Sequence, residues 1–361
     1  MTKKNKVLVA MSGGLDSSVA ALMLHEQGYE VIGITMKTWD FDSAYAPLSE
    51  KNCCNQDSIN DARTFAVKYD FPHYVIDISD EFENVIINNF VDEYLAGRTP
   101  NPCVLCNVHI KWDALLKHAD NLNCEFIATG HYARIRKEND RYVISKGIDK
   151  LKDQSYVLWG ISQENLKRTI LPLGNFHKKE IREVALKNGF ENLARKKESF
   201  EICFIPDNDY RGFLNKKVKD LEDKYKDGNV VSTDGKILGK HKGYPFYTIG
   251  QRKGLNLAFS EPMYVNKIDA KTNTVVLGTK SELLSNNMLV KGVNLVKYPT
   301  IPDNMEVNTK IRYHDEGTLS NIIQDGDSIK VKFHKDVSAI TPGQSAVFYE
   351  GDDVIAGGFI D

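Results

Sequence analysis

The chain has 361 residues, more than one typical hydrophobic core supports, and this length predicts two or three domains. Hydrophobic residues make up 42% of it and charged residues 27%, which excludes the fibrous and intrinsically disordered classes. A formal net charge of −2 excludes a uniformly basic nucleic-acid coat but leaves room for a local basic patch. Neither a signal peptide nor an apolar run of bilayer length is present, so we expect a cytoplasmic protein with no membrane partner.

The strongest local pattern lies in residues 6–27. A short apolar run ends at Ala10, apolar residues then recur with helical spacing, and Gly28 can end the helix. Gly13 and Gly14 stand at the turn, where glycine lets backbone N–H groups approach an anion at the positive end of a helix. This pattern predicts a phosphate-binding turn. The turn matches neither a Walker A loop nor G-x-G-x-x-G.

Strands and helices alternate along the first half of the chain. Strands are predicted at residues 29–36, 73–78 and 126–130, and helices at 56–69, 81–96, 107–120, 163–169 and 177–188. Such alternation predicts an α/β fold with a doubly wound parallel sheet. Ligands of these sheets bind at the carboxyl ends of the strands, where residues 11–18, Met36 and residues 129–131 would converge.

The chain changes character from about residue 229. Short strand-like runs separated by turn residues follow the charged stretch 216–227, at 264–268, 274–277, 328–333, 345–349 and 354–360. We therefore predict a small linking domain followed by a C-terminal β-barrel. The expected domains are residues 1–205, 206–285 and 286–361.

Six cysteines spread over a long intracellular chain argue against a disulfide scaffold. Cys106 precedes the predicted helix 107–120, whose dipole would favour a thiolate, so it is a candidate nucleophile. A packed helix entry with inert thiols, or half of a zinc site, is the alternative interpretation. Cys203 lies in a short apolar run, and on its own it indicates packing.

Two further loops, residues 147–156 and 247–255, mix donors, acceptors and cations. The second pairs flexible glycines with Arg252 and Lys253, as a loop that grips phosphate would. Charged stretches of this kind are more often solvated faces, so neither loop decides the function alone.

Taken together, several stretches resemble the tRNA-specific 2-thiouridylases, the MnmA/TrmU family. They are residues 11–18, 36–39, 96–107, 128–132, 152–156, 202–205, 248–255 and 341–349, and they follow in family order over nearly the whole chain. The resemblance implies a PP-loop ATP pyrophosphatase domain with the adenine nucleotide α-hydrolase-like fold. It also implies that Mg-ATP adenylates the C2 oxygen of the wobble uridine in the tRNAs for Lys, Glu and Gln. Sulfur from a donor protein, a cysteine desulfurase or a sulfur-relay protein, then replaces that oxygen. The target base must leave the anticodon stack to be reached.

The resemblance assigns roles to particular residues. Cys203 would carry the persulfide, and Cys106 would be the nucleophile that forms a transient disulfide with it. Asp16 would help to hold Mg²⁺. The implied ATP contacts are Ala10, Met11, Ser12, Gly13, Gly14, Leu15, Asp16, Ser17, Met36 and Gly130. Asn101, Pro102 and Cys103 would lie against the target base, and His131, Lys152, Asp153, Gln154, Arg312, Tyr313 and Gln344 would contact tRNA. Arg195, Lys196 and Lys197 are close to Cys203 in sequence and would favour its persulfide anion.

Alternatives remain open at the cysteines. Cys103 stands where many family members carry Asp, and with Cys106 and Cys203 it could bind a [4Fe–4S] cluster that leaves one iron open. Cys53 and Cys54 could instead join Cys103 and Cys106 in a zinc site. We expect Cys124 to be structural.

Two other functions compete with thiolation. A different PP-loop enzyme, such as an amide-forming ligase or argininosuccinate synthase, would share the ATP turn without needing paired cysteines. A non-enzymatic tRNA-binding protein would keep the turn as a vestige. Turnover of ATP to AMP with and without tRNA separates these possibilities.

Overall fold

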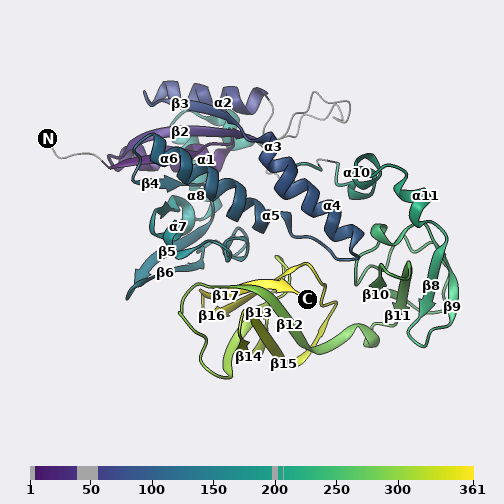
Figure 1. The fold of residues 1–361 in the computed structure, drawn as a ribbon. Coiled ribbons are helices and arrows are strands. Elements are labelled where there is room, and N and C mark those ends of the chain that lie inside the picture. The colour runs from purple at the N-terminus through teal and green to yellow at the C-terminus, as the bar shows by residue number, and fades with distance from the viewer. Residues whose placement is uncertain (1–4, 39–55, 197–201, 206) are drawn as a thin grey trace. The chain divides into compact units, whose positions relative to one another are not determined.

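The structure is a computed structural model that describes residues 5–38, 56–196, 202–205 and 207–361. Its described residues form two compact units (Figure 1). The first comprises Met1–Ile86, Cys103–Asn208 and Asp352–Val354, and the second Ile87–Pro102, Asp209–Gly351 and Ile355–Asp361. Cys53 and Cys54 lie outside the described residues. Across these ranges, no helix is long and apolar enough to cross a membrane.

A five-stranded sheet forms the centre of the first unit. Its order is β3-β2-β1-β4-β7, and every neighbouring pair is parallel. The strands are β1 (Lys6–Ala10), β2 (Glu30–Lys37), β3 (His73–Asp77), β4 (Phe126–Ala128) and β7 (Thr169–Ile170). The predicted parallel α/β sheet is confirmed.

Helices pack against this sheet because its central strand β1 is apolar and buried on both faces. Val7 and Val9 of β1 belong to a core that also includes residues of α1, α2, α8 and α9, while α6 packs on β1 and β4. The helices and helical turns are α1 (Leu15–Glu26), α2 (Gln56–Lys68), α3 (Ser79–Phe82), η1 (Glu83–Ile87), η3 (Ser155–Val157), α7 (Gln163–Lys167), η4 (Pro172–Asn175), α8 (Lys178–Lys187) and α9 (Glu191–Arg195).

The helix predicted at residues 107–120 begins five residues earlier, so that prediction was wrong at its start. It runs as α5 (Pro102–Leu105), the π-helical segment η2 (Cys106–Trp112) and α6 (Asp113–Asn121). Proline fits the first helical turn because its missing N–H has no partner there in any case. Cys106 therefore lies inside the helix, at the start of a π segment, and not in the loop before it.

A hairpin of β5 (Ala133–Glu138) and β6 (Arg141–Lys146) completes the first unit. The sequence did not indicate it, because charged residues interrupt the apolar alternation. Ser145 pairs with Asp353, whose carboxylate accepts hydrogen bonds from Arg136 at 2.8 Å and from Ser145 Oγ at 2.7 Å.

The second unit contains two β structures, as predicted (Figure 1). A four-stranded sheet has the order β10-β11-β8-β9. Six strands in the order β12-β15-β14-β13-β16-β17 form a ring that the β12–β17 pairing closes into a barrel. The strands are β8 (Gly228–Ser232), β9 (Ile237–His241), β10 (Tyr264–Asp269), β11 (Thr274–Gly278), β12 (Leu284–Leu295), β13 (Met305–Lys310), β14 (Thr318–Asp325), β15 (Ser328–Ser338), β16 (Ser345–Glu350) and β17 (Asp353–Ile360).

The remaining elements of this unit are helical: α4 (Asn88–Leu95), α10 (Tyr210–Lys217), α11 (Leu221–Tyr225), η5 (Tyr244–Phe246) and η6 (Ser281–Leu283). The charged stretch 216–227 thus contains the end of α10 and all of α11. The domain boundaries near residues 205 and 285 stay a prediction.

Candidate active site

The turn between β1 and α1 is built to present backbone N–H groups. Gly13 has a φ of +66°, and a Cβ there would lie 2.0 Å from the carbonyl oxygen of Ser58, so only glycine fits. The Ser12 backbone N–H donates to Ser17 Oγ at 3.1 Å, and that hydroxyl donates to the Gly14 carbonyl at 3.2 Å. Gly14 is the N-cap of α1 and supplies no side-chain cap, which leaves the positive helix end available to an anion.

Two more residues with assigned ATP contacts lie at the same edge of the sheet. Gly130 follows β4, the neighbour of β1, and a Cβ on it would lie 2.9 Å from the backbone of Asp16 and Ser17. Met36 is the second-last residue of β2, on the other side of β1. Gly130 and Met36 thus lie at the carboxyl ends of the two strands that flank β1, the edge of the sheet that carries the turn.

Asp16 is paired with a buried lysine that the sequence analysis missed. Lys178 Nζ lies 2.7 Å from both carboxylate oxygens of Asp16, and Tyr132 Oη donates to Oδ1 at 2.7 Å. Lys178 is the first residue of α8 and only 8% exposed. Gln154 supports this arrangement, because its Oε1 accepts from the Tyr132 backbone N–H at 2.9 Å. A buried cation therefore neutralises Asp16 beside the turn.

A second lysine contacts the turn directly. Lys196 Nζ donates to the Gly13 carbonyl at 3.0 Å and to Asp61 Oδ2 at 2.9 Å. We expected Lys196 to act on Cys203, seven residues later in the chain. The structure gives it a contact with the phosphate-binding turn, which the sequence did not signal.

The described cysteines are thiols and form no disulfides with one another. Cys106 is buried at the start of η2, whereas Cys203 is exposed. Burial raises the pKa of the Cys103 thiol even though part of its surface reaches solvent, and the charge of Lys111 opposes that rise. Cys124 is buried with its Sγ 4.0 Å from the Leu122 carbonyl, which agrees with a structural role.

Lys111 also faces the buried His131. Burial lowers the pKa of His131 well below its usual value, and the charge of Lys111 lowers it further. Nδ1 of this ring is 2.7 Å from Thr129 Oγ1, and Lys111 Nζ donates to Asn107 Oδ1 at 2.9 Å. His131 is thus neutral near pH 7, and only 9% of it is exposed.

The four cysteines that the structure describes are not grouped as a metal centre. Among the residues that the structure describes, no three His, Cys, Asp or Glu side chains are grouped so that they could hold a metal ion. Cys103, Cys106 and Cys203 are all described, so they do not form a ready three-cysteine cluster site.

The side chains assigned to tRNA contacts are engaged in different ways. Asp153 accepts from the backbone N–H groups of Gly147 at 3.0 Å and Ser155 at 3.1 Å, so its carboxylate shapes its own loop. In the second unit, Arg312 Nη2 donates to the Ser338 carbonyl at 3.3 Å and lines a polar pocket of about 530 Å³. Tyr313, next to it, is 36% exposed.

Gln344 makes two contacts in the second unit. Its Nε2 donates to the carbonyls of Thr99 at 3.2 Å and Pro100 at 2.8 Å. Asn101 Nδ2 reaches Ser345 Oγ at 3.4 Å. A residue assigned to tRNA by resemblance thus holds the loop that is assigned to the target base.

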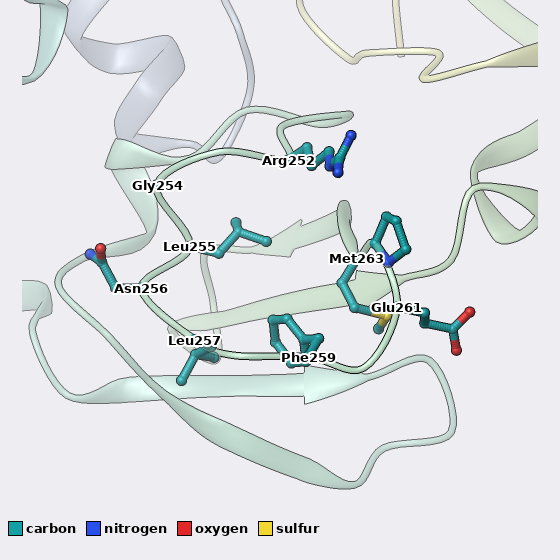
Figure 2. A pocket seen from close by; sticks show the side chains of 9 residues that line it. Arg252, Gly254, Leu255, Asn256, Leu257, Phe259, Glu261 and Met263 are labelled. Atoms are coloured by element: carbon teal, nitrogen blue, oxygen red, sulfur yellow. The ribbon is translucent and has the colours of Figure 1, made fainter.

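The loop 247–255 leads into a second pocket (Figure 2). Its volume is about 230 Å³, and Figure 2 shows Leu255, Phe259 and Met263 around it with Arg252 at its rim. Asn256 and Glu261 also line it, so the pocket combines apolar side chains with polar and charged ones.

A parallel sheet whose first strand leads into a glycine turn at an uncapped helix N-terminus is the arrangement of α/β domains that bind nucleotide phosphates. Family models match all three parts of the chain. They are described as "tRNA methyl transferase HUP domain" over residues 5–207, "tRNA methyl transferase PRC-barrel domain" over 212–279 and "Aminomethyltransferase beta-barrel domain" over 285–360.

Curated relatives resemble the chain over its full length. The tRNA-specific 2-thiouridylase MnmA of Amoebophilus asiaticus is 60% identical over 359 residues, 99% of this chain and 96% of that protein. The proteins of the same name from Cytophaga hutchinsonii and Salinibacter ruber are 58% and 54% identical, each over 100% of this chain, and the match covers 98% and 95% of their own lengths. The chain belongs to the family of tRNA-specific 2-thiouridylases.

Proposed function

We propose that this protein is a tRNA-uridine 2-sulfurtransferase. It uses ATP to activate the C2 carbonyl of the wobble uridine in the tRNAs for Lys, Glu and Gln, and then replaces that oxygen with sulfur. The observation that carries the proposal is the full-length identity to 2-thiouridylases, in a chain whose phosphate-binding turn keeps its glycine geometry. We expect the protein to act in the cytoplasm.

The turn is the proposed site of the ATP phosphates. Ser12, Ser17 and the uncapped N-terminus of α1 supply donors, and Lys196 supplies a cation at the Gly13 carbonyl. Asp16 is the residue that would hold Mg²⁺, since a carboxylate suits this hard cation. Lys178 neutralises Asp16 in the meantime and would have to release an oxygen to the metal.

In the first chemical step, the uridine O2 attacks the α-phosphorus of ATP and pyrophosphate departs. This step converts the uridine O2, a poor leaving group, into part of AMP, a good one. The negative charge that develops on the phosphates is met by helix N–H groups fixed before the reaction, which is how such charge is stabilised most effectively. The turn and its two lysines are this chain's contribution to that step.

In the second step, the terminal sulfur of a persulfide on Cys203 attacks C2. The thiolate of Cys106 then attacks Cys203 Sγ, which forms a Cys106–Cys203 disulfide and leaves the electron pair of the broken S–S bond on the transferred sulfur. AMP departs as the C2–sulfur double bond forms. An external thiol must then reduce the disulfide. The exposure of Cys203 suits a residue that receives sulfur from a donor protein, and the burial of Cys106 suits one that acts inside the site.

A [4Fe–4S] cluster on Cys103, Cys106 and Cys203 remains the alternative route to the same product. We derive no step through it, because these side chains are not grouped as ligands. Anaerobic purification separates the two routes. A colourless active protein supports the persulfide, and a brown protein containing iron and labile sulfide supports the cluster.

Thiol variants test the proposed roles. With ATP and a donor of sulfane sulfur present, such as a persulfide-bearing cysteine desulfurase, Cys106→Ser and Cys203→Ser should each abolish tRNA thiolation, while the matched control Cys124→Ser should keep it. Pyrophosphate release should depend on tRNA and survive in Cys203→Ser, because activation precedes sulfur transfer. Release that ignores tRNA would instead indicate a small-molecule ligase, and thiolation that persists without either cysteine would contradict the persulfide route.

A further inference from the structure

The loop formed by residues 98–102 is held on the barrel by contacts that all lie within the second unit. The Thr99 backbone N–H donates to the Pro342 carbonyl at 2.9 Å. In return, the Gln344 side chain donates to the carbonyls of Thr99 and Pro100 at 3.2 and 2.8 Å. Three consecutive backbone groups of the loop are thereby satisfied by one turn of the barrel, residues 341–345.

That turn is itself fixed. The Gln344 backbone N–H donates to the Thr341 carbonyl at 3.2 Å, and its carbonyl accepts from the Ile360 N–H at 2.8 Å. Gly343 has a φ of +89°, and a Cβ on it would lie 2.7 Å from the Thr99 carbonyl oxygen. The fit is close enough that no side chain can be added at Gly343 without moving the loop.

The loop leads directly into the thiol helix. Pro102 is the first residue of α5, Cys103 follows it, and Cys106 opens η2. Because proline fixes φ and the carbonyls of Thr99 and Pro100 are held, the segment Asn101–Pro102 has few alternative conformations.

We propose that Gln344 is a positioning residue for the target-base loop, in addition to any contact with tRNA. Its two amide N–H groups hold the loop before substrate arrives. Among the described residues no hydrogen bond reaches its Oε1, which leaves that atom for a donor on the tRNA, such as a 2′-hydroxyl. The Gln344 side chain would then contact both the tRNA and the loop that lies against the target base. The roles of tRNA and of the target base in this inference rest on the proposed function, but the hydrogen bonds of Gln344 are present without any substrate.

The test is hydrogen–deuterium exchange by mass spectrometry on the full chain, without tRNA, ATP or sulfur donor. Gln344→Met keeps the length of the side chain and removes the donors, and Gln344→Glu places a carboxylate oxygen against two carbonyls. Both should speed exchange in the peptide containing Thr99 by roughly tenfold, because the docked loop opens more often.

Gln324→Ala is the matched control, since Gln324 also bridges backbone groups in the barrel, at Ile301 N and Gly326 O. It should leave the Thr99 peptide at the wild-type rate. If Gln344 only contacts tRNA, both Gln344 variants will exchange within twofold of wild type and only the KM for tRNA will rise, which overturns the inference. If the wild type fails to thiolate tRNA while the exchange difference stands, the proposed function falls and the positioning role survives.

Discussion

Replacing Lys178 by methionine should destabilise the first unit, because it leaves Asp16 with a poorly compensated charge. The ammonium group lies 2.7 Å from both carboxylate oxygens, and the side chains of Lys178 and Asp16 are 10% and 34% exposed. Breaking a fully buried pair from one side costs about 3–5 kcal/mol. Since Asp16 is one-third exposed and keeps the Tyr132 hydroxyl, we discount this to about 2 kcal/mol.

Tryptophan fluorescence in a urea titration measures this change selectively. The three tryptophans, Trp39, Trp112 and Trp159, all lie within the first 205 residues, so their emission reports this part of the chain. With an m-value of about 2–3 kcal/mol/M, the midpoint should fall by about 0.7–1 M. Lys187→Met is the matched control, as Lys187 is exposed at the other end of α8, and its midpoint should not move.

The double variant Asp16→Asn/Lys178→Met isolates the pair. Removing the charge of Asp16 should recover much of the loss, giving a coupling free energy above about 1 kcal/mol. If Lys178→Met unfolds at the same urea concentration as Lys187→Met, or if the coupling is under about 0.3 kcal/mol, the pair does not stabilise the turn and the reasoning fails.

Three further predictions concern the neighbouring groups. Because burial lowers the folded-state pKa of His131, its neutral form contributes stability that is complete above the unfolded pKa of about 6.5 and lost as pH falls below it. When the pH falls from 7.5 to 5.5, the free energy of unfolding measured in urea titrations should therefore decrease by about 1.4 kcal/mol less in His131→Gln than in wild type. Equal decreases would refute this. The rate at which iodoacetamide alkylates the Cys103 thiol should rise with pH around a midpoint above 9.0, the ordinary pKa of a cysteine, and Lys111→Met should move that midpoint to a higher pH. A shift to a lower pH would contradict the assigned effect of the Lys111 charge. Lys196→Met should weaken ATP binding about two- to fivefold in calorimetry, as befits a partly exposed contact, with Lys196→Arg retaining most of it; unchanged affinity would remove Lys196 from the site.

The fold of the first unit could be predicted because its signals are local. The apolar run of β1, the glycines of the turn and the helical spacing of α1 lie within 25 residues, and each points to the same structure. The start of the thiol helix was missed because Pro102 was taken as a loop residue, although proline suits a first helical turn.

The barrel strands were harder to predict for a different reason. β14 alternates buried and exposed residues, but its letters Thr-Leu-Ser-Asn-Ile-Ile-Gln-Asp bury Ser320 and expose Leu319 and Ile323. Ile322 is buried, so apolar residues lie on both faces of β14 and their pattern does not show which face is the core. Only the pairing with β13 and β15 decides which side is the core.

The parts of the candidate site that form a sequence motif could be predicted. The contacts between residues far apart in the sequence could not. Asp16 and Lys178 are 162 residues apart, Gly13 and Lys196 are 183 apart, and Pro100 and Gln344 are 244 apart. No periodicity in one sequence connects such positions. The fold brings them together, and resemblance alone suggested that Gln344 mattered.

The central claim is that the protein puts sulfur on the wobble uridine, and mass spectrometry of tRNA nucleosides tests it most directly. Cells that lack the protein should lose 2-thiouridine derivatives from the tRNAs for Lys, Glu and Gln. The wild-type chain should restore them, whereas Cys203→Ser should not. Unchanged 2-thiouridine levels in the deleted strain would contradict the account.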